Sequence, residues 1–169
     1  VVPLRGNVDT RLGKVSAGEV DATFLALAGL NRLGRDDVGA HPVAPEEMLP
    51  AVCQGVVGIE RRENDNRIAE LLAPLNDSEA ALTSAAERTL LAGLDGSCRT
   101  PIAALAQVDG NDMYFRAAIV RPDGSELIET ERRGAVADAA RMGEDAANEL
   151  RGKAGPGFFI ETDIDNVDD

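Results

Sequence analysis

The sequence predicts an α/β unit followed by a small α+β domain, with the change between them near residue 76. Before that point, short apolar runs at residues 1–4, 21–27 and 51–59 alternate with helical patterns. Such alternation is typical of α/β proteins with parallel strands. After it, two long helical patterns flank three strand patterns that are separated by turn sequences. The order helix, three antiparallel strands, helix predicts a small α+β domain.

Three helices are expected in the α/β part, over residues 8–17, 28–33 and 67–75. Asn7 is placed to cap the first of them, and Gly34 closes the second. Gly55 and Gly58 interrupt the apolar run at 51–59, which indicates close backbone approach or a hinge.

In the α+β part, Asn76 and Glu79 are spaced for reciprocal capping of a helix that ends at Gly93. The three strands are expected at residues 102–108, 113–120 and 126–131. Gly, Asn, Pro and Asp at 109–111 and 121–124 predict tight turns between them. The last helix is expected over 135–150.

Composition excludes several classes of function. The 169 residues carry a formal charge of −13, which argues against nucleic acid as a partner because phosphate binding needs a basic face. No apolar run approaches the roughly 20 residues that span a bilayer, so no membrane association is expected. Two cysteines do not make a disulfide scaffold, and a reduced, cytoplasmic compartment is expected. The chain opens on an apolar run without an initiator Met, which suggests a fragment.

Three arginines follow predicted strand ends. Arg5 and Arg11 flank the start of the first helix, and Arg32 follows the strand at 21–27. Ligands of open α/β sheets bind at the carboxyl ends of strands, and each guanidinium can grip one carboxylate. These arginines therefore suit a ligand with several carboxylates. Spacing alone favours the alternative that they are solvated surface residues.

Cys98 lies in a Gly-containing loop between a helix and a strand, beside Arg99. A thiol in an exposed loop near a cation can have a lowered pKa and act as a nucleophile. Taken alone, Cys98 is better explained as an ordinary packing cysteine. His41 is the only histidine, and no metal-ligand pattern is present in the sequence.

Four blocks of the sequence, in order, resemble motifs of the porphobilinogen deaminase (hydroxymethylbilane synthase) family. The blocks are residues 4–12 (LRGNVDTRL), 22–34 (ending LAGLNRLG), 49–60 (LPAVCQGVVGIE) and 87–103 (ERTLLAGLDGSCRTPIA). The last block resembles the cofactor-attachment signature, with Gly96-Ser97-Cys98 where the family has Gly-Gly-Cys. The resemblance covers essentially the whole chain.

The resemblance implies an enzyme that condenses porphobilinogen units into hydroxymethylbilane, a linear tetrapyrrole of the heme pathway, and releases ammonia. It implies that Cys98 carries a dipyrromethane cofactor through a thioether. Arg5, Arg11 and Arg32 match arginines that hold the acetate and propionate groups of cofactor and substrate, and Gln54 matches a substrate-binding position. The catalytic Asp of the family has no counterpart here, so the isolated chain is expected to be inactive.

The resemblance also implies a domain layout. Residues 1–51 would be the second half of the family's domain 2, a partial periplasmic-binding-protein-like α/β domain. Residues 52–75 would cross back to domain 1, and residues 76–169 would form the cofactor-attachment domain 3. The full-length enzyme is expected to be monomeric.

Two alternatives to an enzyme fragment stay open at this point. The arginines could belong to a non-enzymatic module that binds a polycarboxylate metabolite, which leaves Cys98 without a role. Alternatively, the C-terminal domain alone could be a folded scaffold, because half of a domain leaves the predicted strand at 21–27 without neighbours.

Overall fold

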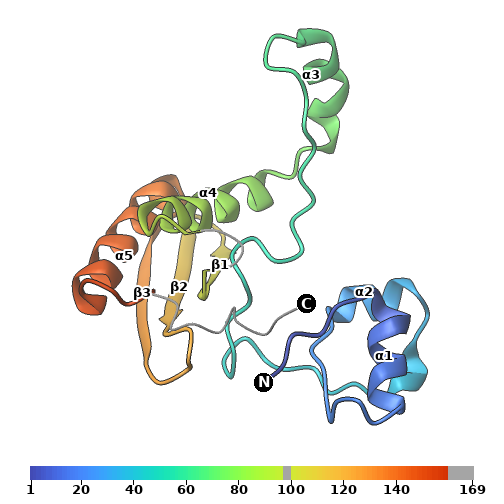
Figure 1. Cartoon of the computed structure of the whole chain (residues 1–169). Coiled ribbons are helices and arrows are strands. Elements are labelled where there is room, and N and C mark those ends of the chain that lie inside the picture. The colour runs from blue at the N-terminus through green and yellow to red at the C-terminus, as the bar shows by residue number, and fades with distance from the viewer. Residues whose placement is uncertain (97–99, 160–169) are drawn as a thin grey trace. The chain divides into compact units, whose positions relative to one another are not determined.

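The computed structural model describes residues 1–96 and 100–159, which fall into two units, Val1–Val43 and the part beginning at Ala44. The first unit contains helices α1 (Val8–Ser16) and α2 (Leu27–Arg32) and a 3₁₀ turn (Asp36–Val38). The helices of the second are α3 (Asn66–Leu72), α4 (Ser78–Gly93) and α5 (Ala139–Ala154), with 3₁₀ turns at Ala73–Leu75 and Val136–Asp138. Its strands are β1 (Ile102–Asp109), β2 (Asp112–Val120) and β3 (Leu127–Ala135) (Figure 1).

The second unit is built around an antiparallel sheet of order β1-β2-β3. Helices α4 and α5 pack against each other and cover one face of the sheet, α4 over β1 and α5 over β3 and β2 (Figure 1). The sequence prediction of a small α+β domain with a three-stranded antiparallel sheet and helices is confirmed.

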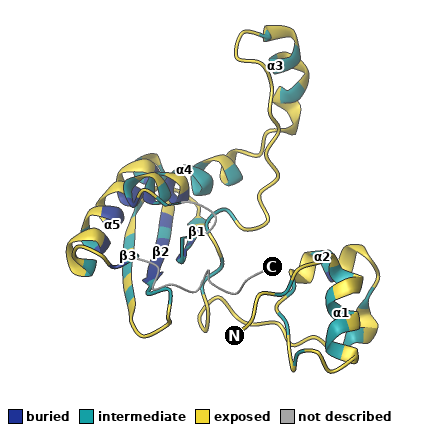
Figure 2. Cartoon of the chain, in the orientation of Figure 1, coloured by how far each residue is buried: buried dark blue, intermediate teal, exposed yellow. Residues whose placement is uncertain are grey.

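The core lies between the two helices and the sheet. Inward residues alternate along β2, where Met113, Phe115 and Ile119 are almost fully buried, as a strand with one covered face requires (Figure 2). Leu90 of α4 and Leu150 of α5 are buried against them. With aromatics at only 3% of the sequence, this core is made largely of aliphatic side chains and Ala.

The hairpin turns follow the predicted turn chemistry. Asp109 pairs with Asp112, so β1 and β2 are joined by Gly110 and Asn111, with Gly110 at φ +61°. The β2–β3 loop is closed by a hydrogen bond from Gly124 N to the Arg121 carbonyl (2.8 Å).

Several predicted boundaries are wrong. β3 runs on to Ala135, because it pairs with β2 along the whole length of that strand, and the last helix therefore starts at Ala139. The cap of α4 is Asp77, whose Oδ1 accepts a 2.9 Å hydrogen bond from Ala80 N. Asn76 instead ends the preceding 3₁₀ turn, where its N–H donates to Ala73 O.

Residues 1–59 form the two helices predicted there but none of the predicted strands. Asn7 caps α1 as predicted, with Oδ1 accepting from Thr10 N at 2.9 Å. Residues 1–4 and 21–27 form no strand, and of 51–59 only Ala51 makes an isolated bridge, to Ala103. A strand needs a neighbour to pair its backbone groups, and these segments find none within the described residues. Within Val1–Val43 only Leu30 is buried, so this unit has little core of its own.

Candidate functional site

The chain enters the loop of Cys98 from a Schellman motif at the end of α4. The N–H of Gly96 donates to Leu91 O (2.9 Å) and that of Asp95 to Ala92 O (3.1 Å), with Asp95 in the left-handed region at φ 52°. This motif fixes the direction in which the backbone leaves the helix. Cys98 itself lies outside the described residues.

Both sides of the loop are anchored to the same core. A Cβ atom on Gly96 would lie 2.5 Å from Ile102 Cδ1 and 2.7 Å from Leu91 Cδ1, so Gly96 packs closely against the ends of these two side chains. After the loop, Pro101 O accepts a 3.0 Å hydrogen bond from Val120 N of β2. The residues that flank 97–99 are therefore held close together at the base of the loop.

Arg5 and Arg11 lie at the start of α1, as predicted. Arg11 folds back, and its Nε donates a 3.0 Å hydrogen bond to Gly6 O. Gly6 has φ +124°, and a Cβ there would come within 2.7 Å of the Thr10 side chain. The turn therefore needs glycine at residue 6. Arg5, which precedes this glycine, is exposed near the N-terminus of α1.

Arg32 is the last residue of α2 and is exposed. Neither Arg5 nor Arg32 has an ion pair or side-chain hydrogen bond within residues 1–96 and 100–159. Arg35, in contrast, binds Asp9 at 2.7 Å and Asp37 at 2.9 Å, which ties the segment after α2 to α1. Arg35 therefore has a structural role, whereas the side chains of Arg5 and Arg32 are exposed and form no ion pair within the described residues.

Gln54 follows directly on Cys53, which adopts φ 56°. Its side chain is exposed and lines an open groove of about 810 Å³. Apolar residues of the same groove include Val56, Val57 and Ile59. Polar and charged side chains line it as well, among them Arg61 and Asp77. Gln54 belongs to a different unit from the three arginines.

Glu87 is a buried acid that sequence reasoning missed. It is 6% exposed on the inner face of α4, and its carboxylate binds two backbone N–H groups, of Cys53 (2.6 Å) and Ala106 (2.9 Å). Burial raises its pKa, and these two hydrogen bonds act in the opposite direction. Its burial could have been predicted from its position one turn before Leu90, on a helix face that is otherwise apolar.

Cys53 is half-buried, and burial followed by the charge of Glu87 raises the pKa of its thiol. Its thiol is therefore a weaker nucleophile than an ordinary one at neutral pH. Among the residues that the structure describes, no group of three His, Cys, Asp or Glu side chains is arranged to hold a metal ion. The same residues include no helix long and apolar enough to cross a bilayer.

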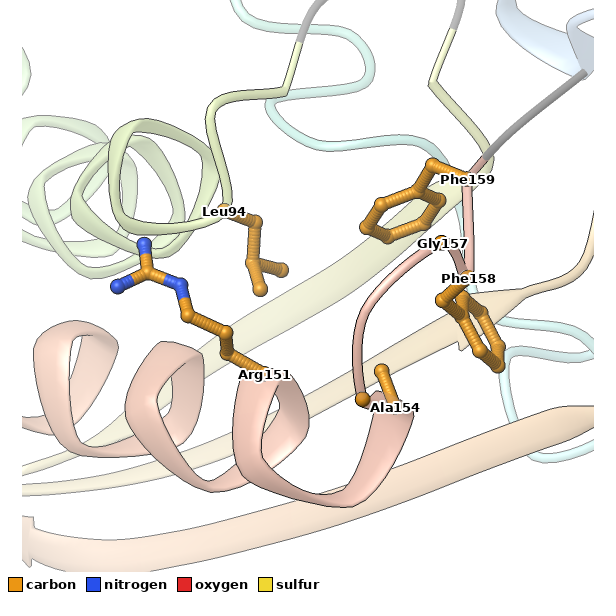
Figure 3. A pocket seen from close by; sticks show the side chains of 7 residues that line it. Leu94, Arg151, Ala154, Gly157, Phe158 and Phe159 are labelled. Carbon is orange, nitrogen blue, oxygen red and sulfur yellow. The ribbon is translucent and has the colours of Figure 1, made fainter.

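A pocket of about 360 Å³ lies beside the C-terminal end of α4. Leu94 and Arg151 line it together with Phe158 and Phe159, which follow α5 (Figure 3). The two rings meet edge to face, with centroids 5.2 Å apart, and the Arg121 guanidinium lies 4.7 Å over Phe158. The Arg121 contact, together with burial of Phe158 in the core that includes Leu94, holds the segment after α5 against the domain.

Comparison with known proteins gives a consistent result along the chain. Residues 1–70 match the family model described as "Porphobilinogen deaminase, dipyromethane cofactor binding domain", and residues 81–152 match "Porphobilinogen deaminase, C-terminal domain". Porphobilinogen deaminase of Paracoccus denitrificans is 55% identical over 159 residues, which are 94% of this chain and 51% of that protein. The enzyme of Nitrobacter winogradskyi is 54% identical over 156 residues, 92% of this chain and 49% of that protein.

The enzyme of Nitrobacter hamburgensis is 53% identical over 156 residues, again with 92% of this chain and 49% of the relative covered. The chain therefore spans about half the length of the curated relatives it matches. Both family models carry the same family name and occur in chain order, and the relatives match across the join between them. The chain belongs to the porphobilinogen deaminase family.

Proposed function

We propose that this chain provides the C-terminal half of a porphobilinogen deaminase. That transferase condenses porphobilinogen units into hydroxymethylbilane, with release of ammonia, in the cytoplasmic synthesis of heme and other tetrapyrroles. The observation that carries the proposal is the match to both family models, in a chain where Gly96 and Pro101 on either side of Cys98 contact the core. The chain by itself is inactive, because the catalytic Asp of the family has no counterpart in it.

The domain layout is part of the proposal. Residues 1–51 belong to a periplasmic-binding-protein-like α/β domain, residues 52–75 cross to another domain, and residues 76–169 form the cofactor-attachment domain. Support comes from exposed apolar side chains in the segments predicted as strands, such as Phe24 (71% exposed) and Val57 (87% exposed). Exposure of this extent is unfavourable unless another part of a longer chain covers these residues and pairs their backbones.

Cys98 is the proposed attachment point of the dipyrromethane, which when bound supplies the primer to which porphobilinogen units are added. The structure supports this role through the loop's surroundings. Gly96 and Pro101, the described residues nearest to Cys98 on either side, both contact the core of this domain. The other thiol, of Cys53, is half-buried and has a raised pKa, so it is poorly suited to attachment.

The arginines and Gln54 are the proposed contacts of cofactor and substrate. Arg5, Arg11 and Arg32 would bind the carboxylates of the pyrrole side chains, and the exposed, unpaired guanidinium groups of Arg5 and Arg32 support this. Arg11 keeps its terminal nitrogens available while Nε holds Gly6 O. Gln54 would contact the substrate from its exposed position in the groove.

Intact-mass spectrometry of the full-length enzyme that carries this sequence tests the proposal. We expect the mass of one dipyrromethane above the polypeptide mass, together with a colour reaction with acidic dimethylaminobenzaldehyde. Cys98→Ser should abolish both signals and turnover. Cys53→Ser is the matched control and should keep the adduct.

Two results would overturn the proposal. One is an unmodified mass for the wild-type protein, unchanged by Cys98→Ser. The other is an adduct that disappears with Cys53→Ser and not with Cys98→Ser. An unmodified protein that still binds porphobilinogen without turnover would instead support a non-enzymatic polycarboxylate-binding module.

A further inference from the structure

One carboxylate joins three parts of the second unit. Glu87 projects from the middle of α4, and its Oε2 accepts the Cys53 N–H at 2.6 Å while Oε1 accepts the Ala106 N–H of β1 at 2.9 Å. Ala106 belongs to an outer strand of the sheet, so Glu87 takes the place of a neighbouring strand's carbonyl. The next partner along this edge is Pro50, whose carbonyl accepts from Ala104 N at 3.0 Å.

The carboxylate also sets the turn that presents Gln54. Cys53 adopts φ 56°, a conformation that costs a non-glycine residue energy and persists only where surroundings hold it. The hydrogen bond from Cys53 to Glu87 does so, and Gln54 N closes the turn onto Ala51 O at 3.0 Å. Gln54 is thereby exposed immediately beside the anchored residue.

The two elements that Glu87 connects to this turn are the same two that flank the Cys98 loop. α4 ends at Gly93 and β1 begins at Ile102, with Cys98 between them in the sequence. We infer that Glu87 is a positioning residue that holds the substrate-binding Gln54 segment in a fixed relation to the cofactor-attachment domain. The inference rests on the proposed function, because that function assigns roles to Gln54 and Cys98.

Stability alone is a weak explanation for a buried acid at this position. No Lys, Arg or His forms an ion pair with Glu87 within the described residues, and taking an unpaired carboxylate out of water is costly. Two charge-assisted hydrogen bonds to backbone N–H groups offset part of that cost. They also fix the position of the Cys53 and Ala106 backbones relative to α4. A neutral side chain of the same size cannot accept from both donors.

Glu87→Gln in the full-length enzyme tests the inference. The amide keeps one acceptor oxygen and turns its NH₂ group toward the other backbone N–H, so one hydrogen bond is lost without a change in volume. We expect the Cys98 adduct and the circular dichroism spectrum to be retained, and the KM for porphobilinogen to rise about tenfold with a smaller change in kcat. Glu144→Gln, an exposed change of equal charge on α5, should leave both constants within about twofold of wild type.

A double-mutant cycle with Gln54→Ala separates positioning from a general loss of stability. If Glu87 acts through Gln54, Glu87→Gln should raise KM by less than about twofold in the Gln54→Ala background. Additive effects on KM, or wild-type constants for Glu87→Gln in an active enzyme, overturn the inference and leave the proposed function standing. A wild-type enzyme without adduct and turnover would instead overturn the proposed function.

Amide hydrogen exchange keeps the inference testable if Glu87→Gln does not fold. In the wild-type protein the Cys53 and Ala106 amides should exchange at least tenfold more slowly than the same amides in the unfolded chain. If the Cys53 amide exchanges at the rate of the unfolded chain, Glu87 does not hold the turn and the inference fails.

Discussion

Gly143 of α5 lies directly against Ala86 of α4, so closely that a Cβ atom on Gly143 would overlap the Ala86 carbonyl group. The same Cβ would lie 3.1 Å from Leu90 N. A second close approach occurs further along, where a Cβ on Gly93 would come within 2.6 Å of Ala147 Cβ. Small residues at these points let the two helices pack nearly backbone to backbone, and this contact positions the end of α4 from which the Cys98 loop departs.

Gly143→Ala should lower the free energy of unfolding by about 1–3 kcal/mol, because the methyl group forces the two helix backbones apart. Urea denaturation followed by circular dichroism measures the change. Gly152→Ala, on the same helix with open space around it, should raise stability by up to about 1 kcal/mol through helix propensity. Equal effects of the two substitutions would show that the helix contact is not tight.

Asp95→Gly should stabilise the domain by about 0.5–1 kcal/mol. Asp95 occupies the left-handed position of the Schellman motif, where glycine avoids the Cβ clash, and its negative charge faces the negative end of the helix dipole. Asp95→Asn removes only the charge and should recover a smaller part of the gain. Thermal unfolding of the three proteins tests this order, and a lower Tm for Asp95→Gly would contradict it.

Gly96→Ala should disturb the base of the Cys98 loop. The new methyl group would displace the Cδ1 ends of Ile102 and Leu91 and would shift Gly96 relative to β1, at a cost of about 1 kcal/mol. In the full-length enzyme we expect a reduced fraction of protein with the dipyrromethane adduct, measured by intact mass. Gly152→Ala, at a site on α5 with open space, is the control and should leave the adduct fraction unchanged.

Acid should weaken the contact between α5 and β3 through Glu149. Its carboxylate binds Lys153, Thr130 and Arg132, and these hydrogen bonds lower the pKa of Glu149 to about 2. A lowered pKa means that the stabilisation is present above the unfolded value near 4.5 and is lost as pH falls toward 2. The side chain is 33% exposed, so solvent screening limits the effect to about 1 kcal/mol.

Glu149→Gln should therefore be about 1 kcal/mol less stable than wild type at pH 7 and equally stable near pH 2. Urea titrations at several pH values test this convergence. Glu144→Gln, on the same helix and exposed, should follow the wild-type profile throughout. A constant difference between Glu149→Gln and wild type across the whole range would rule out the ionised contact as its source.

The features predicted correctly from the sequence are those with local causes. Asn7 caps α1 through a hydrogen bond that spans three residues, and the hairpin turn at Gly110 depends on one left-handed glycine. The alternation of apolar and polar residues along β2 indicates a strand with one covered face, and this pattern too spans only a few residues. The four ordered blocks that resemble the family are likewise a property of the sequence, and the comparisons with known proteins confirmed the family.

Errors arose where a segment's structure depends on distant partners. The runs at 1–4, 21–27 and 51–59 have the apolar content of buried strands, but a strand forms only where another backbone pairs with it. Asp77 displaced Asn76 as the cap of α4 because the 3₁₀ turn that precedes the helix already uses Asn76. The local sequence pattern shows neither that these apolar runs lack a pairing strand nor that a 3₁₀ turn precedes α4.

The sequence by itself therefore determined the family and the α+β domain, because motif order, capping and alternation are encoded over short distances. Only the tertiary structure decided that Glu87 is a buried connector, because its two donors, the N–H groups of Cys53 and Ala106, lie 34 and 19 residues away along the chain. It likewise decided that α5 needs glycine at residue 143, since the fold brings the backbone of Ala86 against it.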